Sequence, residues 1–204
     1  YTKSHTRDIE TLGGLIKSMP KTAILFLIAS AAICALPPLN GFVSEFMIYF
    51  GMFKALAVHN FFSMITLLFT IAGLALVGTM AALCFSKVFS IIFLGLPRSE
   101  KATQVTEDVE ASMLVPMTCI AILIFAIGLC PQYVFNFVLK PASAIIGNQV
   151  QFAQKPLAIM QTIAWYALGL LVFIALMVML KLKLTKNKVV MSETWGCGYD
   201  NPNN

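Results

Sequence analysis

Four long apolar runs are the feature that most limits what this chain can fold into. A helix that crosses a membrane needs about 20 mainly apolar residues, and each run exceeds that length. Hydrophobic residues make up 59% of the 204 residues and charged residues only 11%, which excludes a disordered chain and leaves too little polar surface for a water-soluble globule. The sequence therefore predicts an all-α polytopic membrane protein in the lipid bilayer, with about four spans at residues 22–56, 61–96, 113–138 and 157–180.

The first run is interrupted by the sequence LPPLNG at residues 36–41. Each proline lacks an N–H and restricts the residue before it, so a helix cannot continue through Pro37 and Pro38. The run is long enough for two half-helices, Thr22–Ala35 and Gly41–Phe53, that meet at an unwound strip including Asn40. Unpaired backbone at membrane depth is tolerated only where protein or a water-filled cavity covers it. The alternative is a helical hairpin with a tight Pro-Pro turn.

Lysine and arginine predict the orientation, because loops on the cytoplasmic side carry an excess of them. The turn at 57–60 has no Lys or Arg, and the stretch 140–156 has only two. Basic residues gather in three segments: Lys3, Arg7, Lys17 and Lys21; Arg98 and Lys101; and Lys181, Lys183, Lys186 and Lys188. This alternation fits four spans and favours the broken span over the hairpin. We expect a polar cytoplasmic segment 1–21, a membrane domain 22–181 and a basic cytoplasmic tail 182–204 in the inner membrane.

Glu45 is the one acidic residue inside the apolar runs, and it follows the Pro-Pro break directly. A carboxylate there costs several kcal/mol unless it is neutral, paired or hydrated, so Glu45 is predicted to carry or gate protons. The alternative is a structural glutamate that is hydrogen-bonded to a neighbouring helix. Lys54 is placed to reach the membrane interface. Lys87 is either a second titratable group inside the protein or an anchor at the headgroups.

No motif for covalent chemistry, cofactor binding or metal binding is evident. The five cysteines form no C-x-x-C pair, and neither His5 nor His59 has a partner at metal-ligand spacing. The pair Gly13-Gly14 indicates a turn and nothing more. The net charge of +5 comes from residues between apolar runs, so it points to membrane orientation and away from nucleic acid. We expect no cofactor, no metal and no nucleic-acid partner.

The chain resembles the second half of the antiporter-like membrane subunits of respiratory complex I and their relatives. The resemblance rests on TRDIETLGGL at residues 6–15 and LPPLNGFVSE at residues 36–45. Within that family, CFSKVF at 84–89 and ETWGCGY at 193–199 resemble the branch of hydrogenase-4 component B and formate hydrogenlyase subunit 3. Members of the family are much longer, so this chain is expected to be the C-terminal part of a longer protein.

The resemblance implies a function in ion translocation. Such subunits couple electron transfer to the movement of H⁺ or Na⁺, with H⁺ the expected ion here, and carry no redox centre themselves. Glu45 falls on the family's charged position at the broken helix, and Lys87 falls in the next helix. The implied partners are other membrane subunits and a peripheral arm of hydrogenase or dehydrogenase type. Two alternatives stay open: a subunit of a multi-subunit Na⁺/H⁺ antiporter, and a structural membrane anchor for a peripheral redox enzyme.

Overall fold

The computed structural model describes residues 1–56, 60–146 and 154–184, and every regular element within these ranges is a helix. The predicted all-α class is therefore confirmed. Residues 1–168 form one compact unit and residues 169–204 a second. His59 and the ETWGCGY sequence of the tail lie outside the described residues. The helices are α1 (Pro20–Ile33), α2 (Asn40–Leu56), α3 (Phe61–Phe93), α4 (Glu100–Thr103), α5 (Ala111–Leu129), α6 (Pro131–Ile146) and α7 (Gln154–Leu184).

Within the described ranges, three helices are long and apolar enough to cross a membrane, namely Phe61–Phe93, Ala111–Leu129 and Pro156–Leu184. They correspond to the second, third and fourth predicted runs, and they make the chain a multi-pass membrane protein. The third span is shorter than the predicted range 113–138, because α5 ends at Leu129 and a separate helix, α6, begins at Pro131. The fixed φ and missing N–H of proline suit the first position of a new helix, so the apolar run contains a boundary.

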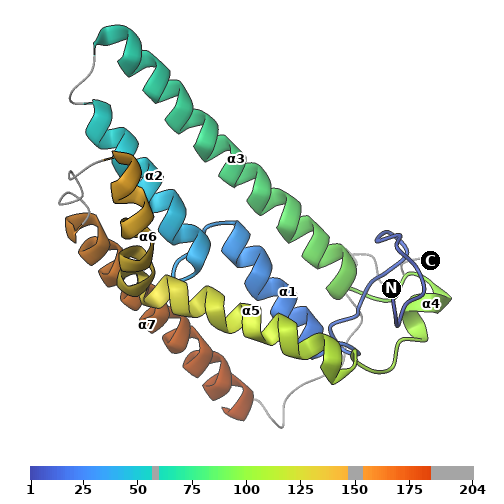
Figure 1. Ribbon diagram of the computed structural model, residues 1–204. Coiled ribbons are helices and arrows are strands. Elements are labelled where there is room, and N and C mark those ends of the chain that lie inside the picture. The colour runs from blue at the N-terminus through green and yellow to red at the C-terminus, as the bar shows by residue number, and fades with distance from the viewer. Residues whose placement is uncertain (57–59, 147–153, 185–204) are drawn as a thin grey trace. The chain divides into compact units, whose positions relative to one another are not determined.

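The first run forms two helices in series. Alone, the 14-residue α1 is too short to cross a membrane, and α2 adds 17 residues after the break. Both helices pack against α3 and against α5, and they follow one another alongside α3 (Figure 1). With 33 residues, α3 extends about 50 Å at 1.5 Å per residue, long enough to accompany both. The first run is therefore one discontinuous span, as predicted, and the hairpin alternative is wrong.

Backbone hydrogen bonds continue through much of the break. The N–H groups of Ala35 and Leu36 donate to the carbonyls of Ala32 and Ala31, at 3.2 and 3.1 Å. The N–H of Leu39 donates to the carbonyl of Leu36 at 3.0 Å. Ala35 has a positive φ of 53°, which turns the chain out of α1. The strip between α1 and α2 is thus a series of tight turns with paired backbone groups.

Two glycines allow other backbone segments to approach this strip closely. A Cβ added to Gly41, at the start of α2, would overlap the carbonyl of Ala32 in α1. A Cβ added to Gly128, near the end of α5, would overlap the carbonyl of Pro38. Gly41 was predicted as part of the break motif, whereas Gly128 was not. These two contacts hold the ends of α1, α2 and α5 together.

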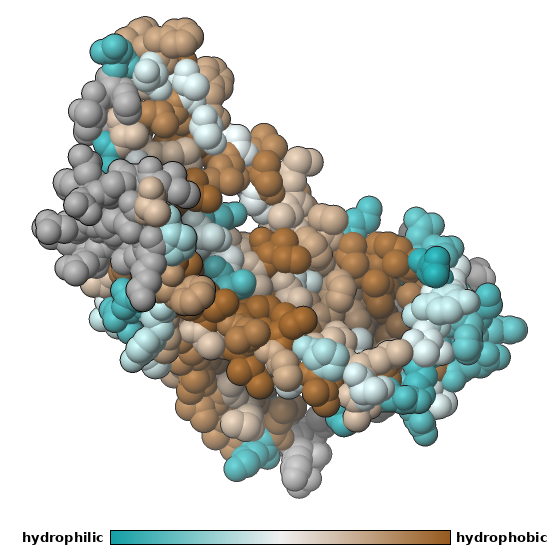
Figure 2. Space-filling model, viewed as in Figure 1, coloured by the Kyte–Doolittle hydropathy of each residue, from teal (hydrophilic) through white to brown (hydrophobic). Residues whose placement is uncertain are grey.

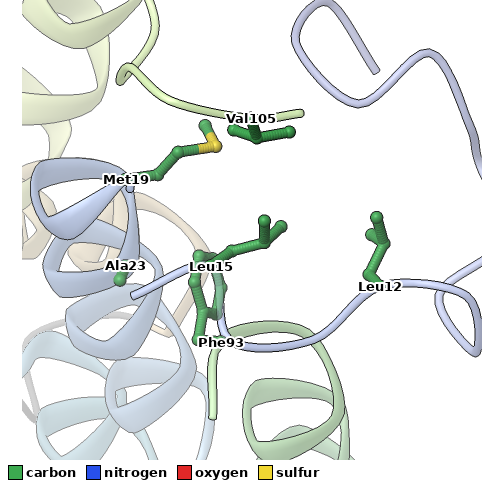
Figure 3. Packing of buried hydrophobic residues seen from close by; sticks show 6 residues of the cluster. All are labelled: Leu12, Leu15, Met19, Ala23, Phe93 and Val105. Atoms are coloured by element: carbon green, nitrogen blue, oxygen red, sulfur yellow. The ribbon is translucent and has the colours of Figure 1, made fainter. Parts of the chain in front are cut away.

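The N-terminal segment packs against the end of α3. The N–H groups of Gly14 and Ile16 donate to the carbonyls of Leu94 and Phe93, both at 3.0 Å. A small apolar core lies beneath this contact and comprises Leu12, Leu15, Met19, Ala23, Phe93 and Val105 (Figure 3). Two of the basic segments predicted to share one side of the membrane, the N-terminal segment and the loop after α3, therefore lie together.

The Gly13-Gly14 pair does more than mark a turn, so that part of the prediction is wrong. Gly13 and Gly14 have φ values of 156° and 64°, of which the second is a conformation that favours glycine. A Cβ on Gly13 would overlap the carbonyl of Leu96, and one on Gly14 would stand 3.0 Å from the carbonyl oxygen of Gly95. Both residues are needed for the close approach of two backbone segments.

Candidate functional site at the helix break

Glu45 lies in the second turn of α2 and is half-buried. Its carboxylate faces Gly78 of α3: a Cβ built on Gly78 would lie 3.8 Å from Oε1 and 4.0 Å from Oε2. Gly78 stands close to the midpoint of Phe61–Phe93. The missing side chain at Gly78 leaves room for the carboxylate beside the α3 backbone, about midway along a membrane-crossing helix.

An open cavity of about 440 Å³ lies at the break, between α1, α2 and α5. Because each water in the liquid occupies about 30 Å³, this space is large enough for roughly a dozen waters. The Ser44 hydroxyl donates to the carbonyl of Gly41 at 2.9 Å, and its oxygen can still accept from water. The lining residues are Ala29, Ala32, Ile33, Ala35, Asn40, Gly41, Ser44, Glu45, Ile120 and Ile124.

The carboxylate of Glu45 forms neither an ion pair nor a hydrogen bond with any residue that the structure describes. An ion pair joins Lys3 Nζ to Glu107 Oε2 at 3.9 Å, but it lies far from the break, in the polar end. A carboxylate at this depth is stable when it is hydrated or protonated. The cavity supplies the space for that hydration.

The two lysines near the apolar runs are not brought to Glu45. Lys87 is exposed and lies nine residues beyond Gly78 on α3, which is about 14 Å along the helix axis and on the opposite face. Lys54 is near the end of α2, and its Nζ lies 5.7 Å from the ring centroid of Phe50. Neither cation contacts the break cavity, so Lys87 is not a direct partner of Glu45 within this chain.

Asp108 was missed by the sequence analysis, although it holds the start of α1. Its carboxylate accepts hydrogen bonds from the N–H of Lys21 at 2.9 Å, from the N–H of Thr22 at 3.3 Å and from the Thr22 hydroxyl. The residue at the N-cap position, Met19, has no capping side chain. Asp108, from the loop before α5, therefore caps α1 and joins its N-terminus to the start of α5.

The pKa of the Asp108 carboxyl reflects this environment. Partial burial acts to raise the pKa, but hydrogen bonds from the Thr22 side chain and from the backbone of Val109, Thr22 and Lys21 outweigh it. The pKa of Asp108 is therefore held below its ordinary value, and the carboxyl is ionised at neutral pH. No local pattern marks such a residue in the sequence, because its partners stand 86 and 87 residues away.

Nothing in the described ranges forms a metal centre. No group of three or more His, Cys, Asp or Glu side chains comes together among those residues, and Cys34, Cys84, Cys119 and Cys130 are free thiols. The backbone N–H of His5 donates to the Tyr1 carbonyl at 2.7 Å, and its ring stands edge-on to the Tyr1 ring. His5 is part of the local structure at the polar end of the chain.

The fold and the break define a class: helical membrane proteins in which a discontinuous span carries an acidic residue at its centre. Residues 1–72 match the family described as NADH:quinone oxidoreductase/Mrp antiporter, transmembrane region. The predicted family resemblance is thus confirmed.

The chain is also similar to several characterised relatives. It is 31% identical to formate hydrogenlyase subunit 3 of Escherichia coli over 203 residues, which is 95% of this chain and 31% of that protein. It is 35% identical to hydrogenase-4 component B of the same organism over 143 residues, covering 70% of this chain and 21% of that protein. It is 33% identical to Na(+)/H(+) antiporter subunit A1 of Staphylococcus saprophyticus over 144 residues, covering 70% of this chain and 18% of that protein. The chain spans about a third or less of the length of these curated relatives.

Proposed function

We propose that this chain is part of an ion-translocating membrane subunit and that Glu45 carries or gates a proton at the centre of the membrane. The observation that carries the proposal is the carboxylate itself: it lies beside Gly78, on a cavity at the helix break, with no charged or hydrogen-bonded partner in the part of the chain described. An intramembrane ionisable group is costly and rare, and this one stands where a helix is interrupted.

The chemistry follows from the two states of the carboxyl. Ionised Glu45 requires water, which the cavity can admit, while protonated Glu45 tolerates the apolar walls formed by Ile33, Ile120 and Ile124. Uptake of a proton therefore changes the hydration that the break requires. Water in the cavity relays the proton to Glu45 and away from it. Lys87 acts as a separate station nearer the polar end, since it is too distant to pair with Glu45.

We place the chain in a redox-coupled assembly in the inner membrane, with the polar end and the tail on the cytoplasmic side. The names of the two Escherichia coli relatives, a formate hydrogenlyase subunit and a hydrogenase-4 component, support this assignment. The partners are then other membrane subunits and a peripheral hydrogenase or dehydrogenase arm. The packing of the N-terminal segment against the loop after α3, both basic, supports the orientation.

A second candidate is a subunit of a multi-subunit Na⁺/H⁺ antiporter, which the similarity to the Staphylococcus antiporter subunit supports. The two candidates share the broken span and differ in the assembly. The third candidate function is that of a purely structural membrane anchor for a peripheral redox enzyme. It predicts that Glu45 can be neutralised without loss of ion movement.

The test is Glu45→Gln in the full-length protein, assembled with its complex in sealed vesicles. Proton uptake is measured during turnover, and the amount of assembled complex is measured in parallel. The matched control is Glu100→Gln, the same substitution in the exposed first turn of α4. We expect Glu45→Gln to reduce proton uptake at least tenfold while Glu100→Gln has no effect. Unchanged uptake in assembled Glu45→Gln complex would exclude Glu45 as the proton carrier.

A further inference from the structure

The helix α6, Pro131–Ile146, was not expected from the sequence and has no part in the break. It begins directly after the membrane span α5 and lies in the same compact unit, residues 1–168. At 100° per residue, the side chains described over its first two turns fall into three sectors. One sector is packed, one is polar and one is apolar but exposed.

The packed sector faces the rest of the unit, and the polar sector borders it. Pro131 is fully buried and Phe135 is half-buried, and these two positions share one side of α6. Gln132 stands on the next side, and its Nε2 donates a hydrogen bond to Oε1 of Gln161 on α7. Asn136 follows one turn after Gln132 in the same sector and is exposed. Protein therefore packs against α6 on the side of Pro131 and Phe135.

The remaining sector turns large apolar side chains outward. Tyr133 and Phe137, one turn apart, are 78% and 82% exposed, and Val134 beside them is 37% exposed. Exposed apolar residues also cover α5, including Val115, Ile122 and Leu123; apolar side chains are widespread on the face of the molecule drawn in Figure 2. Since α5 is long and apolar enough to cross a membrane, and α6 continues from it after a single residue, Cys130, the outward sector of α6 begins at the end of a membrane span.

We propose that α6 is a membrane-interface helix whose outward sector, Tyr133, Val134 and Phe137, inserts among phospholipid acyl chains. A helix that carries an aromatic and aliphatic sector beside a polar one lies at the boundary between headgroups and acyl chains. Tyrosine is enriched at that boundary, because its ring is apolar and its hydroxyl remains in contact with water and headgroups. The helix would fix the depth at which the end of α5 stands. This inference does not depend on the role of Glu45.

Photocrosslinking tests the proposal in the full-length protein in its native membrane. The photoreactive residue p-benzoylphenylalanine replaces Phe137, where it adds one ring to a side chain that is already 82% exposed, so folding is unaffected. The control site is Asn136, the neighbouring residue in the polar sector. Mass spectrometry of the illuminated protein measures lipid adducts, and gel mobility measures adducts to other chains.

We expect lipid adducts at position 137 at least fivefold more abundant than at position 136, with no protein adduct at 137. Equal lipid labelling at both positions would overturn the proposal, because it would show no preferred face. A cross-link from position 137 to another protein would also overturn it, because another subunit would then cover the sector. A second probe at Tyr133 should give the same pattern as Phe137.

Discussion

The contact between Asp108 and the start of α1 gives a stability prediction that the structure makes quantitative. Asp108→Ala removes the acceptor of three backbone N–H groups, those of Lys21, Thr22 and Val109, and of the Thr22 hydroxyl. Replacing an N-cap residue by alanine costs about 1 kcal/mol, in a range of roughly 0.5–2. Hydrogen bonds to a charged acceptor are at the upper end of such values, and Asp108 is half-buried. We therefore expect Asp108→Ala to lower the free energy of unfolding by about 2 kcal/mol.

The assay is reversible unfolding of the full-length protein in mixed micelles, titrated with a denaturing detergent. The matched control is Asp8→Ala: Asp8 also accepts a backbone N–H, from Glu10 at 3.0 Å, but only within an exposed local turn. Exposed substitutions of that kind change stability by about 0.5 kcal/mol or less. If both variants lost the same stability, within about 0.5 kcal/mol, the cap would not contribute to holding α1.

The same contact predicts a dependence on pH. The folded pKa of Asp108 is lowered, so the ionised form is favoured in the folded state. The stabilisation is then fully present above the unfolded pKa of about 3.9 and is lost as the pH falls through the lower folded value. The stability difference between wild type and Asp108→Ala should stay constant from about pH 5 to 8 and narrow below about pH 4. A gap that widens on acidification would contradict the assignment.

Two further predictions concern glycines at the break. Gly128→Ala places a Cβ on the Pro38 carbonyl and should lower the free energy of unfolding by about 2 kcal/mol. The control is Gly51→Ala, because Gly51 has open space around it. In the same unfolding measurements it should be neutral or stabilising by up to about 1 kcal/mol. Gly78→Leu should fill the space beside the Glu45 carboxylate and reduce proton uptake, whereas Gly73→Leu, also in open space on α3, should not. Equal effects within either pair would refute the corresponding packing argument.

The discontinuous span was predictable because its cause is local. Pro37 and Pro38 stop a helix wherever they stand in the fold, and Glu45 is conspicuous because it is the acid inside an apolar run. The roles of Asp108 and Gly128 were not predictable, because each depends on a backbone group distant in sequence. An Asp in a polar loop and a Gly in an apolar helix carry no mark of such a contact.

The division of the third run had a signal that was passed over. Cys130-Pro131 offers a helix end followed by proline at a first helical position, but apolar residues continue through Val138. Hydrophobicity alone therefore merged a spanning helix with α6. In our assignment α5 and α6 both expose apolar side chains to lipid, and Tyr133 and Phe137 do so on α6. Composition therefore does not distinguish the two helices in the sequence.

The paired backbone of the break bears on which ion the site suits. A metal cation that enters a protein site must exchange its water shell for protein oxygens. The carbonyls of Ala31, Ala32 and Leu36 already accept N–H groups, and Gly128 closes over that of Pro38. Each of the three hydrogen-bonded carbonyls therefore has one lone pair left with which to replace a water of a sodium ion. A proton needs no such shell, only one carboxylate and connected water, so the paired backbone supports our proposal that Glu45 carries a proton rather than a sodium ion.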